Sequence, residues 1–245
     1  SKDAISDHLC VRGYHEVINY SFVKKDTDNQ ISGKESKLEL LNPISTEMAV
    51  MKSSHLAGLL QNLKRNLSRQ NNRIRLFEVG NVFSGNIKNH NEVEKIAAIA
   101  NGPIEEESWD SNNNDISFFN LKGDLDSLLM NNKDEDLFRY EGNKNNKIFH
   151  PSYSADIYRK DEIIGVIGML NPILTRNNDI SGDVYFFEID YKKAFKRSPI
   201  IAKPISKYPQ IRRDISIVVD SHITSSELIK AVKEIKPSTI QSVNV

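Results

Sequence analysis

The chain has 245 residues with 33 acidic and 33 basic side chains, so no overall charge favours binding to nucleic acid or to a membrane surface. Its single cysteine, Cys10, excludes an internal disulfide and a cysteine-rich zinc site and is typical of a reducing cytoplasm. No stretch approaches the roughly 18 consecutive apolar residues of a membrane span. We therefore expect a cytoplasmic protein with one large domain, alone or with a small second one.

The first elements are predicted to be short. Ile5 and Leu9 indicate a helix, on which Cys10 is expected to be a small core residue. Residues 15–23, HEVINYSFV, alternate between apolar and polar side chains and predict a strand. The polar run over 24–37 predicts a loop.

The strongest periodic pattern predicts a helix that is followed by a buried strand. Ser53 and Ser54 are residue types that favour the N-cap of this helix. Residues 74–79 are mostly apolar and predict a strand closed by Gly80. A helix with one apolar face needs a partner surface, and the strand indicates that this surface is a sheet. The leucines at the three- and four-residue spacing of one helix face are Leu56, Leu59, Leu60, Leu63 and Leu67.

The following segments mix strands and helices irregularly. Trp109, in an acidic loop, is expected to cover apolar surface, and Gly123, inside a predicted helix, is expected to mark close packing. This order of elements predicts an α+β fold with a mixed, mainly antiparallel sheet and flanking helices. The predicted elements are a polar loop over 84–94, a strand over 95–101, a helix over 118–130, a hairpin over 154–170 and a strand over 183–190.

A change in composition after residue 197 predicts a second domain. Ile215 to Val219 reads as a buried strand, and Thr224 and Glu227 form the capping box of a helix. Residues 239–245 alternate and predict another strand, so the order β-α-β is the first half of a ferredoxin-like fold. The predicted boundaries are a first domain over 1–197, a linker over 198–202 and the truncated ferredoxin-like segment over 203–245.

Several segments in one order resemble a known family. They are RGYHEVINYSFV, LNPISTEM, NLSRQ, FFNLKGDLDSLL, HPSYSADIY, IGVIGMLNP and KYPQIRRDISIVVD. Each is weak alone, but together they cover nearly the whole chain, which is similar to the C-terminal part of the beta subunits of bacterial phenylalanine-tRNA ligases. The resemblance implies a class II aminoacyl-tRNA synthetase-like module over 1–197 and the start of an anticodon-binding domain over 203–245.

The resemblance also implies an activity and partners. The family attaches phenylalanine to tRNA(Phe) with ATP and Mg²⁺, in an assembly of two alpha and two beta subunits whose catalytic site lies on the alpha subunit. We therefore expect a cytoplasmic ligase subunit whose partners are the alpha subunit and tRNA(Phe), with no membrane contact. No cofactor or metal is expected on this chain itself.

The positions that class II chemistry needs are altered in this sequence. An arginine after the central strand stabilises negative charge on the α-phosphate, and the matching segment GNVFSG has Ser84 there. Glycines let ATP approach the last strand, and Glu188 and Asp190 occupy those positions, with Lys193 in place of an arginine. Because two carboxylates would repel phosphates, we expect a catalytically silent module with no catalytic residue.

Two groups of basic residues are candidates for contacts with tRNA or with a partner subunit. Arg212 and Arg213 precede the predicted strand and are candidates for binding tRNA phosphates, the alternative being a salt bridge with Asp214. The other group, which fits a solvated helix face equally well, comprises Lys64, Arg65, Arg69 and Arg73, with Arg75 close behind.

Other enzyme signatures are missing from the sequence. It contains no phosphate-binding loop, no His-Glu-x-x-His and no Gly-x-Ser-x-Gly. The six histidines lack metal-ligand spacing, and His150 is expected to anchor the start of a hairpin. Two alternatives stay open, a self-sufficient class II ligase and a free-standing RNA-binding or scaffold module with a borrowed class II synthetase fold. The altered positions oppose the former.

Overall fold

The computed structural model describes residues 1–36, 38–110, 114–130, 138–196, 209, 211–235, 240 and 243. The chain divides into two compact units, Ser1–Ser198 and Pro199–Val245. Within the described ranges, none of the helices combines the length and hydropathy that crossing a bilayer requires.

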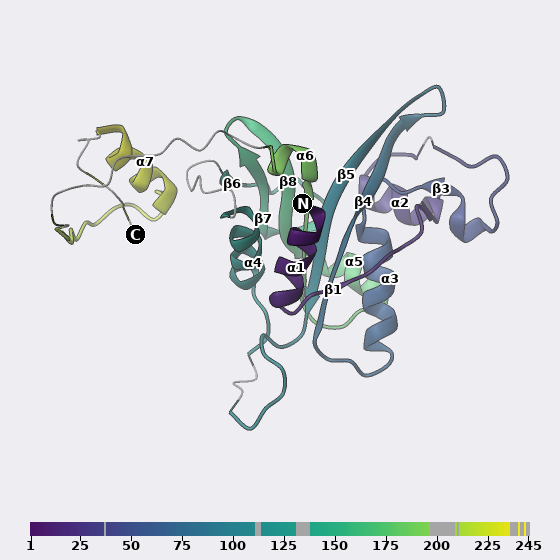
Figure 1. Cartoon of the computed structure of the whole chain (residues 1–245), viewed down its shortest axis with the longest axis horizontal. Helices are drawn as coiled ribbons and strands as arrows, with labels where there is room; N and C mark the ends of the chain where they lie inside the picture. Colours follow the sequence, from purple (N-terminus) through teal and green to yellow (C-terminus); the bar gives the residue numbers. More distant parts are fainter. Residues whose placement is uncertain are drawn as a thin grey trace. The chain divides into compact units, whose positions relative to one another are not determined.

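A seven-stranded sheet forms the centre of the first unit (Figure 1). Its order is β1-β4-β5-β9-β8-β7-β6, and β1 is parallel to β4 while the other neighbours are antiparallel. The predicted mixed, mainly antiparallel α+β sheet is therefore confirmed. Its strands are β1 (His15–Glu16), β4 (Ile74–Asn86), β5 (Asn89–Asn101), β6 (Phe138–Gly142), β7 (Phe149–Arg159), β8 (Glu162–Leu170) and β9 (Val184–Asp190). A two-stranded sheet pairs β2 (Phe22–Val23) with β3 (Val50–Met51).

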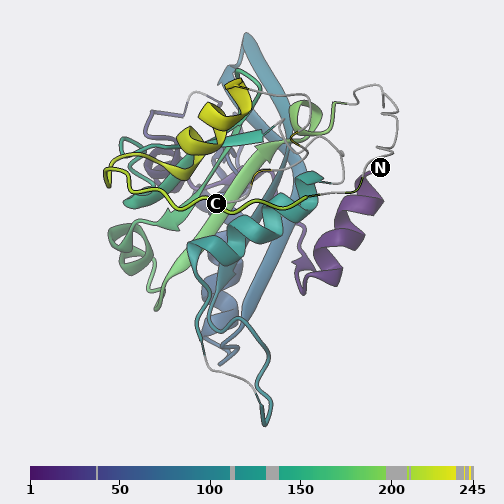
Figure 2. The ribbon, with the colours of Figure 1, turned by 90° about the vertical axis from the view of Figure 1, so that its left-hand side faces the viewer.

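Helices cover both faces of the large sheet (Figures 1 and 2). Because side chains alternate along a strand, β5 contributes Ala98 to a core under α1 (Lys2–Val11) and α4 (Phe118–Met130), and Ala97 to a core under α3 (Leu56–Leu67). The other helical segments are α2 (Lys25–Ser32), the 3₁₀ turn η1 (Thr46–Met48), α5 (Pro172–Asn177), α6 (Tyr191–Ala194) and α7 (Ser225–Ile235).

Helix α3 forms where the leucine spacing predicts it. Leu63 is fully buried, whereas Leu67, at the last turn, is only half-buried. The burial of the apolar face of α3 therefore decreases toward the C-terminus of the helix. The start differs from the prediction, since the N-cap is His55, whose side chain makes no capping bond. Ser54 Oγ instead accepts a hydrogen bond from the Leu56 backbone N–H at 3.1 Å.

The polar residues after the central strand form a hairpin and not the predicted loop. Strands β4 and β5 stay in register from the Ile74–Asn101 pair out to the Asn86–Asn89 pair, leaving a two-residue turn. Asn86 Oδ1 accepts from the backbone N–H of Asn89 at 2.9 Å. Backbone pairing therefore continues well beyond the apolar part of each strand.

Three expectations near the N-terminus are wrong. The predicted strand over 15–23 is broken into β1 and β2, with Ile18 and Tyr20 exposed between them. The predicted loop contains α2, because buried Asp28 accepts two hydrogen bonds from Ser53, its N–H at 2.9 Å and its hydroxyl at 2.7 Å. Cys10 is exposed, since it lies on the outer side of α1.

Two further expectations about packing are also wrong. Trp109 is 97% exposed, so within the described residues it does not pack as a cover over apolar surface. A Cβ added to Gly123 would meet no atom within 4 Å, so this glycine marks no close approach. The hairpin of β7 and β8 and the strand β9 form as predicted, with Lys160 at φ +56° in the turn.

In the second unit, α7 begins with the predicted capping box. Thr224 N–H donates to Glu227 Oε2 at 2.7 Å, and Glu227 N–H donates to Thr224 Oγ1 at 3.3 Å. The predicted buried strand from Ile215 to Val219 is wrong, because these residues are exposed and no described strand lies beside them. Of the strand predicted over 239–245, only Ile240 and Val243 are among the described residues.

Candidate functional site

Two glutamates lie in one row of the large sheet, on the side that α3 covers. Glu78 of β4 and Glu188 of β9 both pair with Ala97 of β5, one from each side. Their exposed fractions are only 4% and 6%. Because an ionised carboxylate is costly to bury without partners, the surrounding donors decide what this site does.

Glu78 accepts hydrogen bonds from two side chains and lies close to the His55 ring. Its Oε1 lies 2.7 Å from Lys52 Nζ and 3.2 Å from His55 Nδ1, and its Oε2 accepts a hydrogen bond from Asn19 Nδ2 at 2.7 Å. Asn62 Nδ2 in turn donates to Asn19 Oδ1 at 2.8 Å, which fixes the orientation of the amide. Burial raises the pKa of Glu78, but His55, Asn19 and Lys52 outweigh it and lower this pKa from 4.5 to about 2.

Glu188 is held at the start of α3. Its Oε1 accepts hydrogen bonds from the His55 backbone N–H at 2.8 Å and from Ser54 Oγ at 2.9 Å. Its Oε2 lies 2.7 Å from Lys95 Nζ of β5. Burial again acts to raise the pKa, and electrostatic and hydrogen-bond contacts with Lys95 and His55 lower the pKa of Glu188 below its usual value.

His55 joins the two carboxylates. Its backbone binds Glu188 while its ring nitrogens face Glu78 and the Gly80 carbonyl oxygen, 3.1 Å from Nε2. A Cβ at Gly80 would lie 3.3 Å from His55 Cε1, so the ring packs directly against the strand. We call the connected side chains the ionic network; its members are Lys52, His55, Glu78, Lys95 and Glu188.

The ionic network fills the sheet face and leaves little of it accessible. Lys52 and His55 are 3% and 0% exposed, and each buried glutamate has a lysine within 2.7 Å. A substrate could reach this face only by breaking several charge-assisted hydrogen bonds. The arrangement is suited to holding α3 on the strands, and it presents no free nucleophile or general base to solvent.

The altered class II positions are not brought together. Glu188 belongs to the ionic network, whereas Ser84 is exposed in the β4–β5 hairpin opposite Asn91. Asp190 is the N-cap of α6 and accepts from the Lys193 backbone N–H at 2.9 Å. Lys193 Nζ lies 2.8 Å from Glu162, outside the network.

Sequence reasoning missed most of the ionic network. Lys52, His55, Glu78 and Lys95 come from segments that no motif joins. One signal was available, since Glu78 interrupts the apolar run RLFEVG as Glu188 interrupts FFEID. A carboxylate within a buried strand requires partners, and that requirement points to a site.

The basic residues on the last turn of α3 and after it lie in different surroundings. Lys64 pairs with Asp179 at 2.8 Å, whereas the side chains of Arg65 and Arg69 are exposed without a partner among the described residues. Arg73 donates from Nε to the Ile104 carbonyl oxygen at 3.3 Å. Arg75 is buried and donates to three carbonyl oxygens, those of Ile74, Asn101 and Pro103.

The remaining predicted residues make local contacts. In the second unit, Arg212 pairs with Asp214 at 3.2 Å and Arg213 is exposed. His150 Nδ1 accepts from the Ser152 N–H at 3.2 Å, which is the structural role expected of it. In the part of the chain that the structure describes, no three His, Cys, Asp or Glu side chains are placed to hold a metal ion.

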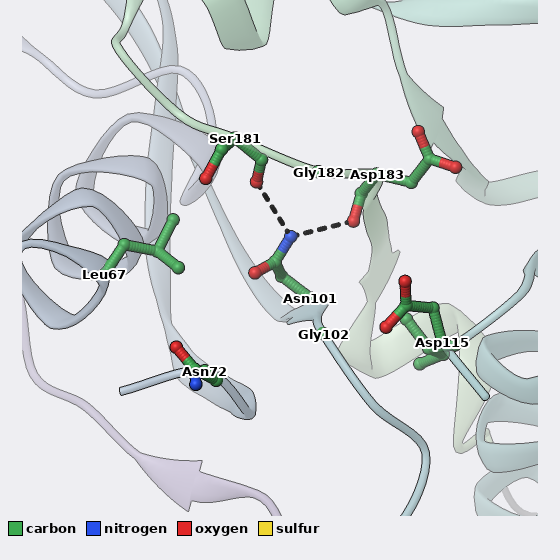
Figure 3. Close-up of a pocket in the computed structure, with 9 residues that line it drawn as sticks. Leu67, Asn72, Asn101, Gly102, Asp115, Ser181, Gly182 and Asp183 are labelled. Carbon is green, nitrogen blue, oxygen red and sulfur yellow. Dashed lines mark hydrogen bonds between the residues drawn. The ribbon is translucent and has the colours of Figure 1, made fainter. Parts of the chain in front are cut away.

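A hollow of 200 Å³ lies where β5 ends and β9 begins (Figure 3). Asn101 Nδ2 donates to the carbonyl oxygens of Ser181 and Asp183, at 3.3 and 2.9 Å. Gly182, between them, has φ +77°, which favours glycine. The Asn101 amide therefore holds the turn before β9 in place. The hollow is formed by the shape of this turn, and we assign it a structural role.

Comparison with known proteins gives the same fold and one family. The family described as "Phenylalanyl tRNA synthetase beta chain CLM domain" matches residues 1–191. The phenylalanine-tRNA ligase beta subunit of Coxiella burnetii is 36% identical over 91% of this chain and 28% of its own length. That of Francisella tularensis is 33% identical over 100% of this chain and 30% of its own length. The chain thus spans less than a third of the length of these curated relatives.

A solved structure extends the comparison to the fold. The pyrrolysyl-tRNA synthetase of Desulfitobacterium hafniense superposes with a TM-score of 0.58 at 13% identity, over 79% of this chain and 66% of that chain. Identity this low concerns the fold alone. The expected class II synthetase-like architecture is confirmed.

Proposed function

Because this chain belongs to the family of phenylalanine-tRNA ligase beta subunits, we propose that it is the synthetase-like part of such a subunit. The ligase attaches phenylalanine to tRNA(Phe) with ATP and Mg²⁺, and the chemistry resides on the alpha subunit of an assembly with two alpha and two beta subunits. Residues 1–197 serve as a silent structural and interface module. Residues 203–245 begin an anticodon-binding domain.

The ionic network is the observation that carries this proposal. Nucleotide activation on a class II sheet needs an open face and cations for the phosphates. Here two ionised carboxylates, Glu78 and Glu188, lie on the sheet face that α3 covers, and a lysine is already paired with each of them. A triphosphate would have to displace these pairs and would meet net repulsion from the glutamates.

The two alternatives are less well supported. A self-sufficient ligase requires the phosphate-binding arginine, and Ser84 is exposed on a hairpin away from the ionic network. A free-standing RNA-binding or scaffold module does not explain a match with beta subunits over more than nine-tenths of the chain.

We assign tRNA positioning to exposed basic side chains. Arg65 lies on the last turn of α3 and Arg69 lies just after the helix. Neither side chain has a carboxylate partner in the described residues. Arg212 and Arg213 are the candidates in the second unit, with Arg212 partly neutralised by Asp214. We expect that changing these residues to glutamine weakens tRNA(Phe) binding and makes the remaining binding less dependent on salt concentration.

Two measurements test the proposed function together. Calorimetric titration of the chain with ATP, with and without phenylalanine, is expected to give no binding heat. Titration of the same chain with the alpha subunit is the positive control, because it shows that the chain is folded and able to assemble. Affinity capture of the chain from a mixture with the alpha subunit is expected to retain both. Micromolar ATP binding, or failure to retain the alpha subunit, contradicts the proposal.

A further inference from the structure

A hollow of 490 Å³ lies on the sheet face opposite the ionic network. It is bounded by the end of α1, by α4 and by the start of β4, and Figure 2 shows the two helices on the same side of the sheet. The charged residues that line it are Arg12, Arg73, Arg75 and Asp124. Three guanidinium groups and one carboxylate give the lining an excess of positive charge.

The excess charge is only partly neutralised within the described structure. Arg75 is only 4% exposed and donates to carbonyl oxygens, with no carboxylate within 4.0 Å. Burial lowers the pKa of Arg75 and nearby Arg73 acts in the same direction, while Tyr14 and Asp124 partly oppose them. Among the three arginines, Arg12 has the nearest counter-ion, since its Nε lies 3.1 Å from Asp124. A buried cation of this kind favours an anion in the adjoining space.

Arg73 is already positioned to supply free donors. Its Nε binds the Ile104 carbonyl oxygen, while in the described residues neither Nη atom donates a hydrogen bond. The nearest carboxylate, that of Glu106, is 4.0 Å from Nη1 and 88% exposed. A Cβ at Gly13 would lie 3.0 Å from Nη2, so this glycine leaves room for the guanidinium. The planar fork matches a carboxylate in geometry and charge.

Apolar side chains frame these donors. Val11 and Phe119 border the hollow and are 87% and 73% exposed, and Ile104 and Ile116 complete its wall. A polyanion such as RNA fits poorly, because the adjoining loop carries Glu105, Glu106, Glu107 and Asp110. A single carboxylate beside an apolar side chain satisfies both the arginines and the exposed apolar rim.

We propose that this hollow binds a carboxylate of the alpha subunit, presented next to an apolar side chain that packs on Val11 and Phe119. The inference rests on the proposed function, which supplies the alpha subunit as partner. The carboxylate accepts hydrogen bonds from Arg73 and adds a counter-charge to Arg75. The contact is therefore an anchor of the subunit interface whose strength falls as salt concentration rises.

The test compares Arg73→Gln with Arg176→Gln. Both changes remove one positive charge, but Arg176 is exposed on α5, whose Leu174 packs in the core on the opposite sheet face. Titration of the alpha subunit with each variant is followed at low and high salt, after circular dichroism has verified folding. We expect Arg73→Gln to weaken binding about tenfold or more and to reduce its salt dependence, because a charged hydrogen bond is lost. Arg176→Gln is expected to bind as the wild type does.

A second variant guards against a folding defect in the first. Phe119→Ala removes an exposed ring without touching an ion pair and is expected to weaken binding several-fold. If both Arg73→Gln and Phe119→Ala bind the alpha subunit with wild-type affinity, this inference is overturned and the proposed function stands. The same holds if these variants lose tRNA(Phe) binding while their binding to the alpha subunit is unchanged. A wild-type chain that does not bind the alpha subunit overturns the proposed function as well.

Discussion

Glu78 and Glu188 face each other across Ala97 in a single row of the sheet, and His55 contacts both of them. Two carboxylates so placed repel one another unless cations lie between or beside them. Lys52 and Lys95 provide these cations, one for each glutamate. The members are therefore energetically coupled, and the effects of changing two of them will not add.

Glu78→Gln should change how stability depends on pH. The pKa of Glu78 falls from 4.5 to about 2 on folding, so between these values the unfolded chain binds more protons than the folded one. The stabilisation is complete above about pH 5, is lost as pH falls toward 2, and is on the order of 3 kcal/mol. Urea unfolding at a series of pH values should therefore show a smaller loss of stability on acidification in the variant.

Glu162→Gln provides the control for this experiment. Its hydrogen bond with Lys193 also lowers the pKa of Glu162, but the pair is solvent-exposed and contributes little. The control should follow the wild-type pH profile closely. A Glu78→Gln profile parallel to the wild type would show that this carboxylate gains nothing on folding.

Leu63→Ala should strongly destabilise the first unit. Leu63 is fully buried between α3 and the sheet, and its truncation leaves a cavity that costs about 2–5 kcal/mol. Leu67→Ala, one turn later on a half-buried side chain, should cost clearly less. Chemical denaturation of both variants gives the comparison, and equal midpoints would mean that the burial of α3 is misassigned.

Ser84→Arg should not create ATP binding. The new guanidinium would lie on the exposed β4–β5 hairpin, while Glu78 and Glu188 still occupy the sheet face. Calorimetric titration of this variant with ATP and phenylalanine should give the same absence of binding as the wild type. Micromolar affinity gained by this single change would contradict the blocking role of the ionic network.

The second unit should exchange its amide hydrogens faster than the first. The backbone of Ile215, Ile217 and Val219 belongs to no described strand, whereas Leu76 and Phe77 lie within the paired strand β4. Hydrogen exchange followed by NMR should show weak protection at the first group and strong protection at the second. Equal protection in a verified monomer would argue against the proposal that residues 203–245 begin an anticodon-binding domain.

Local patterns are sufficient for the elements that carry their own signal. The leucine spacing places α3, and two apolar runs around the polar turn at Lys160 place β7 and β8. The capping box of Thr224 and Glu227 likewise depends on residues three positions apart. In each case the pattern that identifies the element lies within the segment itself, even where, as for α3, the packing that stabilises it comes from the sheet.

Interactions between distant segments explain what the sequence could not reveal. Glu78 and Glu188 acquire partners only when β4, β5 and β9 align, so their roles are invisible along the chain. The apolar residues from Ile215 to Val219 resemble a strand, yet a strand also needs a neighbour with which to pair. Conversely, the polar ends of β4 and β5 become strands because each finds the other through a two-residue turn.

The burial of the ionic network also restricts how this sequence can change over generations. Loss of a single charged member leaves its partner buried and unpaired, at a cost of about 3–5 kcal/mol, whereas exchanging a whole pair for apolar residues is often neutral. Glu78→Leu alone, for example, would leave the buried Lys52 without its carboxylate and should strongly destabilise the first unit. Opening this sheet face to solvent therefore requires several coincident substitutions, and folding stability alone is enough to keep it closed.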